Sequence, residues 1–178
     1  MSRTLFNLLL VASCFTLLGG CGLTQAVSDG TASTARAIFH KQVKTLRLDL
    51  DARTAMNPEG HDMRALSVPT QVRVYQLRDR MALEKASYDA IAADSEALLR
   101  DDLLDEHALV LKPGSGAQLN VRLARETQFV ALVALFREPD DRLHTWRLTL
   151  RRDQLLPDQA RVVELGDNRL SLRPLDKE

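Results

Sequence analysis

The chain has little of what nucleic-acid binding, sugar binding or disulfide stabilisation requires. Aromatic residues make up 4% of its 178 residues, so it offers few flat platforms on which sugars or bases stack. Lysine and arginine together number 24, as do aspartate and glutamate, and no basic face emerges for a nucleic acid. The two cysteines, Cys14 and Cys21, both lie near the N-terminus. A domain formed by the rest of the chain must therefore depend on its hydrophobic core.

Motifs for catalysis and for metal binding are missing as well. The histidines show no HxxH, HExxH or Cys/His spacing; they are His40, His61, His107 and His144. Ser115 lies in PGSGA, which lacks the spacing of a GxSxG elbow. Adjacent charged residues point in different directions, so we interpret Asp101–Asp102 as a solvated helix end, Asp140–Asp141 as a turn and Arg151–Arg152 as a solvated strand end. The sequence predicts a protein that is not an enzyme and holds no cofactor or metal.

An apolar N-terminal run is the first feature that the sequence does have. Arg3 precedes a stretch from Leu5 to Leu18 with few polar residues, which is the pattern of an export signal. The run is shorter than the roughly 20 apolar residues that span a bilayer, and it ends in small residues, as a signal peptidase site requires. The sequence LGGC at residues 18–21 resembles a bacterial lipobox.

In proteins with a lipobox, the cysteine thiol receives a diacylglyceryl group, the signal is cut before the cysteine, and the new amine is acylated. We therefore predict a cleaved signal peptide over residues 1–20 and a covalent acyl lipid on Cys21. VASC at residues 11–14 also fits the pattern, but cutting there leaves a very short apolar region and a greasy segment on the mature chain. An ordinary signal followed by an unmodified cysteine is the other alternative.

The predicted lipid also indicates a location. Two acyl chains anchor a protein stably in a bilayer, whereas one chain holds it only marginally. Gly22 follows the cysteine, at a position where lipoproteins retained at the inner membrane typically carry aspartate. We therefore expect attachment to the lipid bilayer of the outer membrane, on its periplasmic face.

Residues 21–41 are predicted to form the lipidated N-terminus and a tether. The stretch from Leu23 to His40 is rich in Ser, Thr, Ala and Gly, and fully extended it reaches roughly 60 Å at about 3.3 Å per residue. In the alternative, its apolar residues share one side of a short helix that docks on the domain; they are Ala26, Val27, Ala35, Ile38 and Phe39. The folded domain is predicted over residues 42–178.

Alternation of apolar and polar residues predicts that this domain is mainly β. The predicted strands are 46–51, 70–77, 117–123, 129–136, 144–152, 161–165 and 169–173. The fourth is apolar throughout, so both its faces should be buried, and Trp146 is expected in the core. Residues 81–104 are rich in Ala, Leu and Glu and predict one or two amphipathic helices. We predict a two-sheet β-sandwich with this short helical insertion between strands two and three, against one edge, or alternatively a small barrel.

The connection from Ala52 to Pro69 is far longer than a normal hairpin loop of 2–5 residues. Asn57-Pro58 starts a turn, and Gly60 permits positive φ. Met56 and Met63 offer adaptable apolar contacts. A long loop on a rigid scaffold usually either binds something or is disordered, and the residues alone favour neither.

Several of these features occur together in one family. They are the lipobox, LRLDL at 46–50, NPEG at 57–60, SVPTQVRVYQL at 67–77, an acidic helical stretch running to DLL, LKPG at 111–114, and FVALVALFRE followed by WR at 146–147. In this combination the sequence resembles the TssJ family, the outer-membrane lipoproteins of type VI secretion systems. The resemblance runs from Cys21 to near the C-terminus.

The resemblance implies a transthyretin-like β-sandwich without catalytic activity. It implies binding to the periplasmic C-terminal domain of the inner-membrane protein TssM and, through it, to TssL, in an envelope-spanning membrane complex. It also implies that the loop between the first two strands contacts the partner. Here the tip of that loop is Asn57, Pro58, Glu59, Gly60, His61, Asp62, Met63 and Arg64. The alternatives are a transthyretin-like periplasmic lipoprotein that carries a small ligand, and an enzyme with an unrecognised site.

Overall fold

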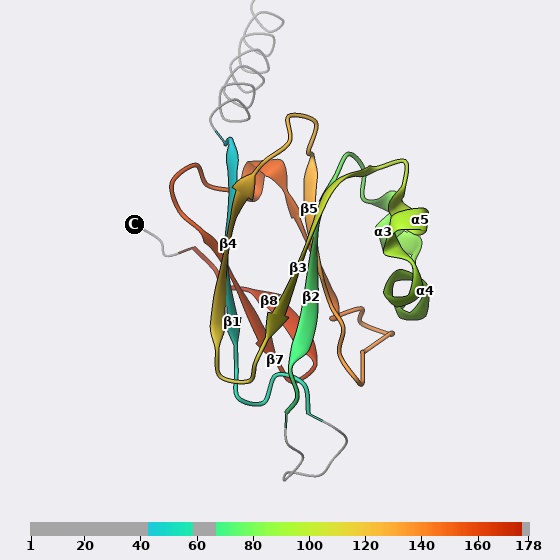
Figure 1. Cartoon of the computed structure of the whole chain (residues 1–178), viewed down its shortest axis with the longest axis vertical. Coiled ribbons are helices and arrows are strands. Elements are labelled where there is room, and N and C mark those ends of the chain that lie inside the picture. Colours follow the sequence, from blue (N-terminus) through green and yellow to red (C-terminus); the bar gives the residue numbers. More distant parts are fainter. Residues whose placement is uncertain (1–42, 59–66, 176–178) are drawn as a thin grey trace, which may run out of the picture. The chain divides into compact units, whose positions relative to one another are not determined.

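The computed structural model describes residues 43–58 and 67–175. The chain divides into two units, residues 1–41 and 42–178, and every described residue lies in the second. The described part of that unit forms eight strands in two four-stranded sheets, with three short helices beside them (Figure 1). This confirms the predicted two-sheet β-sandwich. The predicted signal peptide, Cys21 and the tether lie outside the described residues.

The first sheet has the strand order β4-β1-β7-β8. Its strands are β1 (Thr45–Ala52), β4 (Gly116–Arg122), β7 (Arg161–Gly166) and β8 (Arg169–Leu172). β1 pairs antiparallel with β4 and parallel with β7. Leu46, Leu48 and Leu50 are at most 1% exposed because the strand turns every second side chain inward, and this places the polar residues between them on the outer face.

The second sheet has the order β3-β2-β5-β6, and all its pairs are antiparallel. Its strands are β2 (Thr70–Leu77), β3 (Leu103–Leu111), β5 (Phe129–Ala134) and β6 (Arg147–Arg151). Val72, Val74 and Leu132 are fully buried. Inward residues of both sheets form the core, as in other sandwiches. Trp146 is also fully buried, which confirms its prediction as a core residue.

The helices cover the outer face of the second sheet and do not lie at an edge as predicted. They are α3 (Met81–Lys85), α4 (Tyr88–Ala93) and α5 (Ser95–Leu99). Arg73 of β2 donates to the Ile91 carbonyl and to Ser95 Oγ, both at 3.2 Å. Tyr75 and Leu77 on this face are fully buried. The position follows from β2 and β5, whose second face is apolar too and needs a cover.

The predicted helical run to residue 104 is wrong at its end. α5 ends at Leu99, and β3 begins at Leu103. No strand was predicted here because Ala108 and Val110, on the outward face of β3, are apolar like the inward Leu109, so the alternation of apolar and polar residues is weak. Val110 is consequently 67% exposed.

Arg152 holds the point at which the chain enters the sandwich. It lies in a short 3-10 turn, Arg152–Gln154, and is 5% exposed. Its guanidinium donates to the carbonyl oxygens of Val43 at 3.0 Å, and of Ala124 and Thr127 at 2.9 Å. Burial lowers its pKa from the ordinary arginine value. The prediction that Arg151–Arg152 is a solvated strand end is therefore wrong for Arg152.

We expect Arg152→Met to lower the free energy of unfolding by about 2–4 kcal/mol, because several buried carbonyls lose their donor. Urea unfolding followed by the fluorescence of Trp146, which is the single tryptophan, measures this change. Arg151→Met is the matched control, since the side chain of Arg151 is 61% exposed and pairs with Asp153 at the surface. Equal losses in the two variants would contradict the role of Arg152.

Candidate functional site

The long β1–β2 connection leaves the sandwich at the end opposite to the point where the chain enters it. β1 runs from Thr45 to Ala52, so the two points are separated by about 26 Å at about 3.3 Å per residue. The β3–β4 turn and the β7–β8 turn lie at the same end as the connection (Figure 1). Residues 53–58 and 67–69 of the connection are described, and they form what we call the loop base.

Backbone hydrogen bonds attach the loop base to the neighbouring turns. The Arg53 amide donates to the Leu165 carbonyl at 2.8 Å, and the Asp167 amide donates to the Ala55 carbonyl at 2.8 Å. Asp167 and Asn168 have φ values of 51° and 56°, as a type I′ hairpin turn requires. The sequence Gly166-Asp167-Asn168 favours such a tight turn, and the structure has it between β7 and β8. In this turn the backbone amide of Asn168 donates to the Met56 carbonyl at 3.1 Å.

Asn57 ties the two ends of the loop together from a buried position. It is 1% exposed, and its Nδ2 donates to Thr70 Oγ1 at 2.9 Å. Its Oδ1 accepts from the Arg137 amide at 3.0 Å, beyond the end of β5, and its own amide donates to Ser67 Oγ at 2.8 Å. Because the groups are buried and paired, Asn57 positions the loop instead of offering a surface to a partner.

The structure thus separates the predicted loop residues into two groups. Asn57 is buried, and Pro58 is half-buried with its carbonyl accepting from Asn168 Nδ2 at 3.3 Å. The other six, residues 59–64, lie outside the described residues, as does Cys21. Sequence reasoning did not identify Thr70 and Asn168 as supports of the loop. A tight turn can be read from Gly166-Asp167-Asn168 in the sequence, but the contact of Asn168 with a loop about 110 positions earlier cannot.

An ion-pair network joins the start of the loop to the C-terminal segment. Arg173 contacts Glu164 at 2.7 Å and Asp51 at 3.1 Å, and Arg53 contacts Glu164 at 2.8 Å. Arg173, followed by Arg53, holds the pKa of Glu164 below its usual value. Each pair is exposed on at least one side, so its contribution to stability is small, but together the pairs restrain Arg53.

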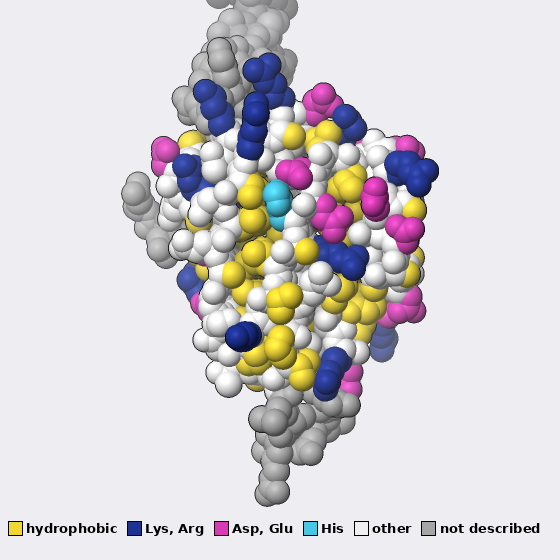
Figure 2. Space-filling view, viewed as in Figure 1, with side chains coloured by type: hydrophobic (Ala, Val, Ile, Leu, Met, Phe, Trp, Pro, Cys, Tyr) yellow, Lys and Arg dark blue, Asp and Glu magenta, His cyan; other side chains and the backbone are white. Residues whose placement is uncertain are grey.

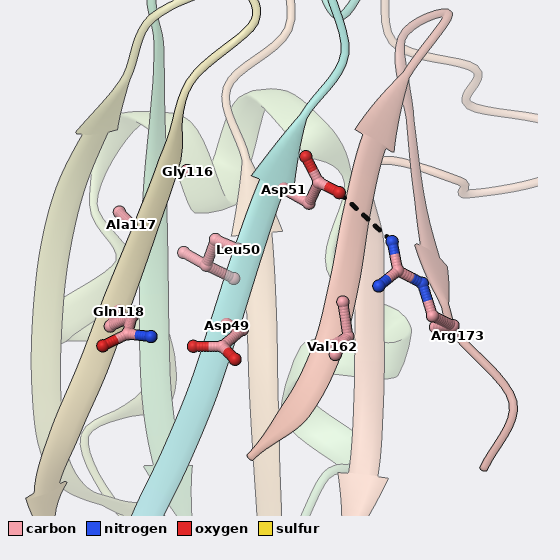
Figure 3. A pocket seen from close by; sticks show the side chains of 8 residues that line it. All are labelled: Asp49, Leu50, Asp51, Gly116, Ala117, Gln118, Val162 and Arg173. Atoms are coloured by element: carbon pink, nitrogen blue, oxygen red, sulfur yellow. Dashed lines mark hydrogen bonds and ion pairs between the residues drawn. The ribbon is translucent and has the colours of Figure 1, made fainter. Parts of the chain in front are cut away.

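A shallow depression of about 460 Å³ lies on the outer face of the first sheet, beside this network (Figure 3). Its lining residues are Asp49, Leu50, Asp51, Gly116, Ala117, Gln118, Val162 and Arg173. The Arg173–Asp51 ion pair crosses one side of it. The depression is on the surface and not between the sheets, so it does not match the interior pocket of a ligand carrier.

In the part of the chain that the structure describes, no group of three or more His, Cys, Asp or Glu residues is arranged to hold a metal ion. No helix of that part has the length and apolar character needed to cross a membrane. The chemistry available at the loop base is that of contact and support.

Comparison with known families gives a match over almost all of the described domain. The profile of the family described as type VI secretion lipoprotein, VasD, EvfM, TssJ, VC_A0113, matches residues 44–168. This span begins directly before β1 and ends in the β7–β8 turn. A search among curated proteins gives no match.

Solved structures match as well. A chain in the structure described as "T6SS protein TssM C-terminal domain (869-1107) from EAEC" is 33% identical, with a TM-score of 0.67 over 75% of this chain and 100% of that chain. A chain in the structure "Type VI membrane complex" is 34% identical, with a TM-score of 0.70 over 74% and 99%. Lip of Serratia marcescens, a membrane-bound component of the type VI secretion system, shares the fold, at 23% identity and a TM-score of 0.64 over 74% and 98%.

We expect Asn57→Ala to lower the free energy of unfolding by about 1–3 kcal/mol, because buried donors and acceptors lose their partners. A double-mutant cycle with Thr70→Val, followed by urea unfolding, isolates the Asn57–Thr70 hydrogen bond. The expected coupling is about 1 kcal/mol. Additive losses would show that the two side chains stabilise the loop base independently.

Proposed function

The chain belongs to the type VI secretion lipoprotein family that includes TssJ, and we propose that it anchors the membrane complex of this secretion system to the outer membrane by binding TssM. Members of the family are lipoprotein components of the type VI secretion system, and the chain is not an enzyme. The observation that carries the proposal is the match to a chain in the structure described as the TssM C-terminal domain.

The lengths in that match support TssM as the partner. The TssM fragment, residues 869–1107, is longer than this entire chain of 178 residues. The alignment covers 100% of the matched chain but only 75% of this one. The matched chain is therefore shorter than the TssM fragment. We infer that the matched chain is a companion of the TssM domain in that structure. A match in a type VI membrane complex supports the same partnership.

In the proposed arrangement, the signal peptide over residues 1–20 is removed and Cys21 carries the acyl lipid. The lipid is inserted in the outer membrane on its periplasmic face, and residues 21–41 form the tether to the domain over residues 42–178. Two or more acyl chains make such an anchor stable. TssM then connects the anchored lipoprotein to TssL at the inner membrane.

The described geometry suits this arrangement because the tether and the loop attach to opposite ends of β1. A domain held at its entry point, Val43, therefore presents the loop away from its attachment. The loop base is fixed by Asn57 and by the turns around it. We propose that the loop tip contacts TssM through residues 59–64, and that Asn57, with Pro58 beside it in the loop base, positions them.

A transthyretin-like lipoprotein that carries a small ligand is the second candidate, but no observation on the described residues favours it. The described depression lies on the outside of the first sheet. Mass spectrometry of the native lipoprotein distinguishes the two functions, because a carrier would retain a stoichiometric small molecule.

We expect Cys21→Ser to leave a folded domain that no longer stays with the outer membrane, because no acyl chain can be attached to serine. Fractionation of cells and mass spectrometry of the mature N-terminus measure location and acylation. Cys14→Ser is the matched control and should retain both. An acylated, membrane-bound Cys21→Ser variant would move the lipidation site.

We expect replacement of residues 59–64 by a Gly-Ser stretch of equal length to weaken binding to the TssM C-terminal domain about tenfold or more, which is about 1.4 kcal/mol. The melting temperature should stay unchanged because Asn57 and Pro58 are kept. Calorimetric titration measures the affinity. The control replaces Asp158 and Gln159, which are exposed in the connection before β7, and should bind normally. Unchanged affinity in the loop variant would place the TssM contact elsewhere.

A further inference from the structure

One side of the sandwich is open, and the other is closed. β4 and β3 end the two sheets on the same side and are joined by the turn at residues 112–115 (Figure 1). Neither strand pairs with the other within the described residues. On the opposite side, the Leu170 amide in β8 donates to the carbonyl of Thr145, two residues before β6, at 2.8 Å, and bridges the sheets.

The open side leaves part of the core uncovered. Leu109 of β3 lies opposite the buried Val72, and Val121 of β4 lies opposite the buried Leu46, yet Leu109 and Val121 themselves are only half-buried. Ala117 of β4 is half-buried in the same way. We call these three residues the open seam. Figure 2 shows hydrophobic side chains along the side of the molecule that β3 and β4 form in this view.

Each end of the open seam is closed by a defined structure. At one end, Gln76 is fully buried and bridges the strands, because its Nε2 donates to the Arg122 carbonyl at 2.9 Å and to Asp105 Oδ2 at 3.3 Å. At the other end is the β3–β4 turn, where the Ser115 carbonyl accepts from the Ala52 amide at 2.9 Å. The seam therefore runs for about 16 Å along five residues of β4 and ends against the loop base.

Of the two edge strands on the open side, β3 and β4, β3 suits pairing with an additional strand better. Soluble proteins usually protect long edge strands with lysine, proline or bulges. The register of β3 against β2 shifts only near its start, between Leu103 and Asp105, and from Asp105 to Leu111 the strand holds neither lysine nor proline. The half of its edge next to the β3–β4 turn is apolar on both faces, with Leu109 toward the core and Val110, 67% exposed, on the outer face. Asp105, Glu106 and His107 make the other half polar. The outward residues of β4, Gln118 and Asn120, are polar.

We propose that an extended segment of the TssM C-terminal domain adds to β3 as a further strand and covers the open seam. The inference rests on the proposed function. Backbone hydrogen bonds to the edge of β3 that no described strand pairs with would supply affinity. Alternate side chains would cover Leu109 and Val121 on one face and Val110 on the other. TssM is the occupant because the seam ends at the loop base, so one partner reaches the loop and the seam together.

Photo-crosslinking in cells that contain TssM tests this contact in the full-length lipoprotein. Benzoylphenylalanine is placed at Val110 and Val121, at His61 in the loop, and at Gln159 as the exposed control before β7. We expect covalent adducts with TssM from Val110, Val121 and His61, and none from Gln159. Adducts of the seam positions with a second copy of the chain, or with its own N-terminal segment, would overturn the proposal.

The outcomes separate the seam from the function on which it rests. Adducts with TssM from His61 alone would overturn the seam and leave the proposed function standing, whereas no adduct from any of the three positions would overturn both. As a second measurement, Val110→Lys introduces the charge that natural edges use against strand addition. We expect it to weaken TssM binding roughly tenfold, while Gln118→Lys, an equal change on the exposed face of β4, leaves the affinity unchanged.

Discussion

The buried side chain of Asn57 is the constraint on which the candidate site depends. A long connection on a sandwich does not belong to the backbone hydrogen bonding of a sheet, so its shape must come from contacts at its two ends. Asn57 supplies those contacts at once, since it reaches Thr70 at the return of the chain and Arg137 beyond β5. An amide in a buried position is costly unless both its donor and its acceptor are satisfied, so the same contacts that stabilise it also fix where the loop departs.

Elsewhere in the domain, arginine side chains join segments in the way that Asn57 does at the loop. Their partners are backbone carbonyls and not carboxylates. Arg152 holds the chain entry, and Arg147 donates to carbonyls at the end of α3, among them that of Glu84 at 2.9 Å. A guanidinium has five donors in a fixed plane, so one side chain satisfies several carbonyls that no regular ladder reaches. In a domain without a described disulfide, these arginines join segments that lie far apart in the sequence.

The predictability of the structure follows the strength of the local signals. Strands such as β1, with leucine at every second position, could be read directly, as could the turn at Asp167 and Asn168. β3 is not predicted because apolar residues on its outward face, Ala108 and Val110, weaken the alternation. The prediction for Arg152 is wrong because two adjacent arginines look alike without knowledge of the carbonyls around them. The loop was found by its length, but its supports come from β2, the β5–β6 connection and the β7–β8 turn, which only the tertiary fold brings together.

The placement of the loop directly after β1 bears on how the domain would carry load in the proposed complex. Tension between a tether at Val43 and a partner at the loop acts on the two ends of one strand, so the covalent backbone of β1 carries it. β1 is also held on both sides, by β4 and by β7, and its leucines are buried along its length. A partner bound only to a strand of the second sheet would instead pull the two sheets apart through side-chain packing, which is weaker and not directional. A TssM strand paired with β3 would attach the partner to the second sheet as well, so the load would be shared by both sheets of the sandwich.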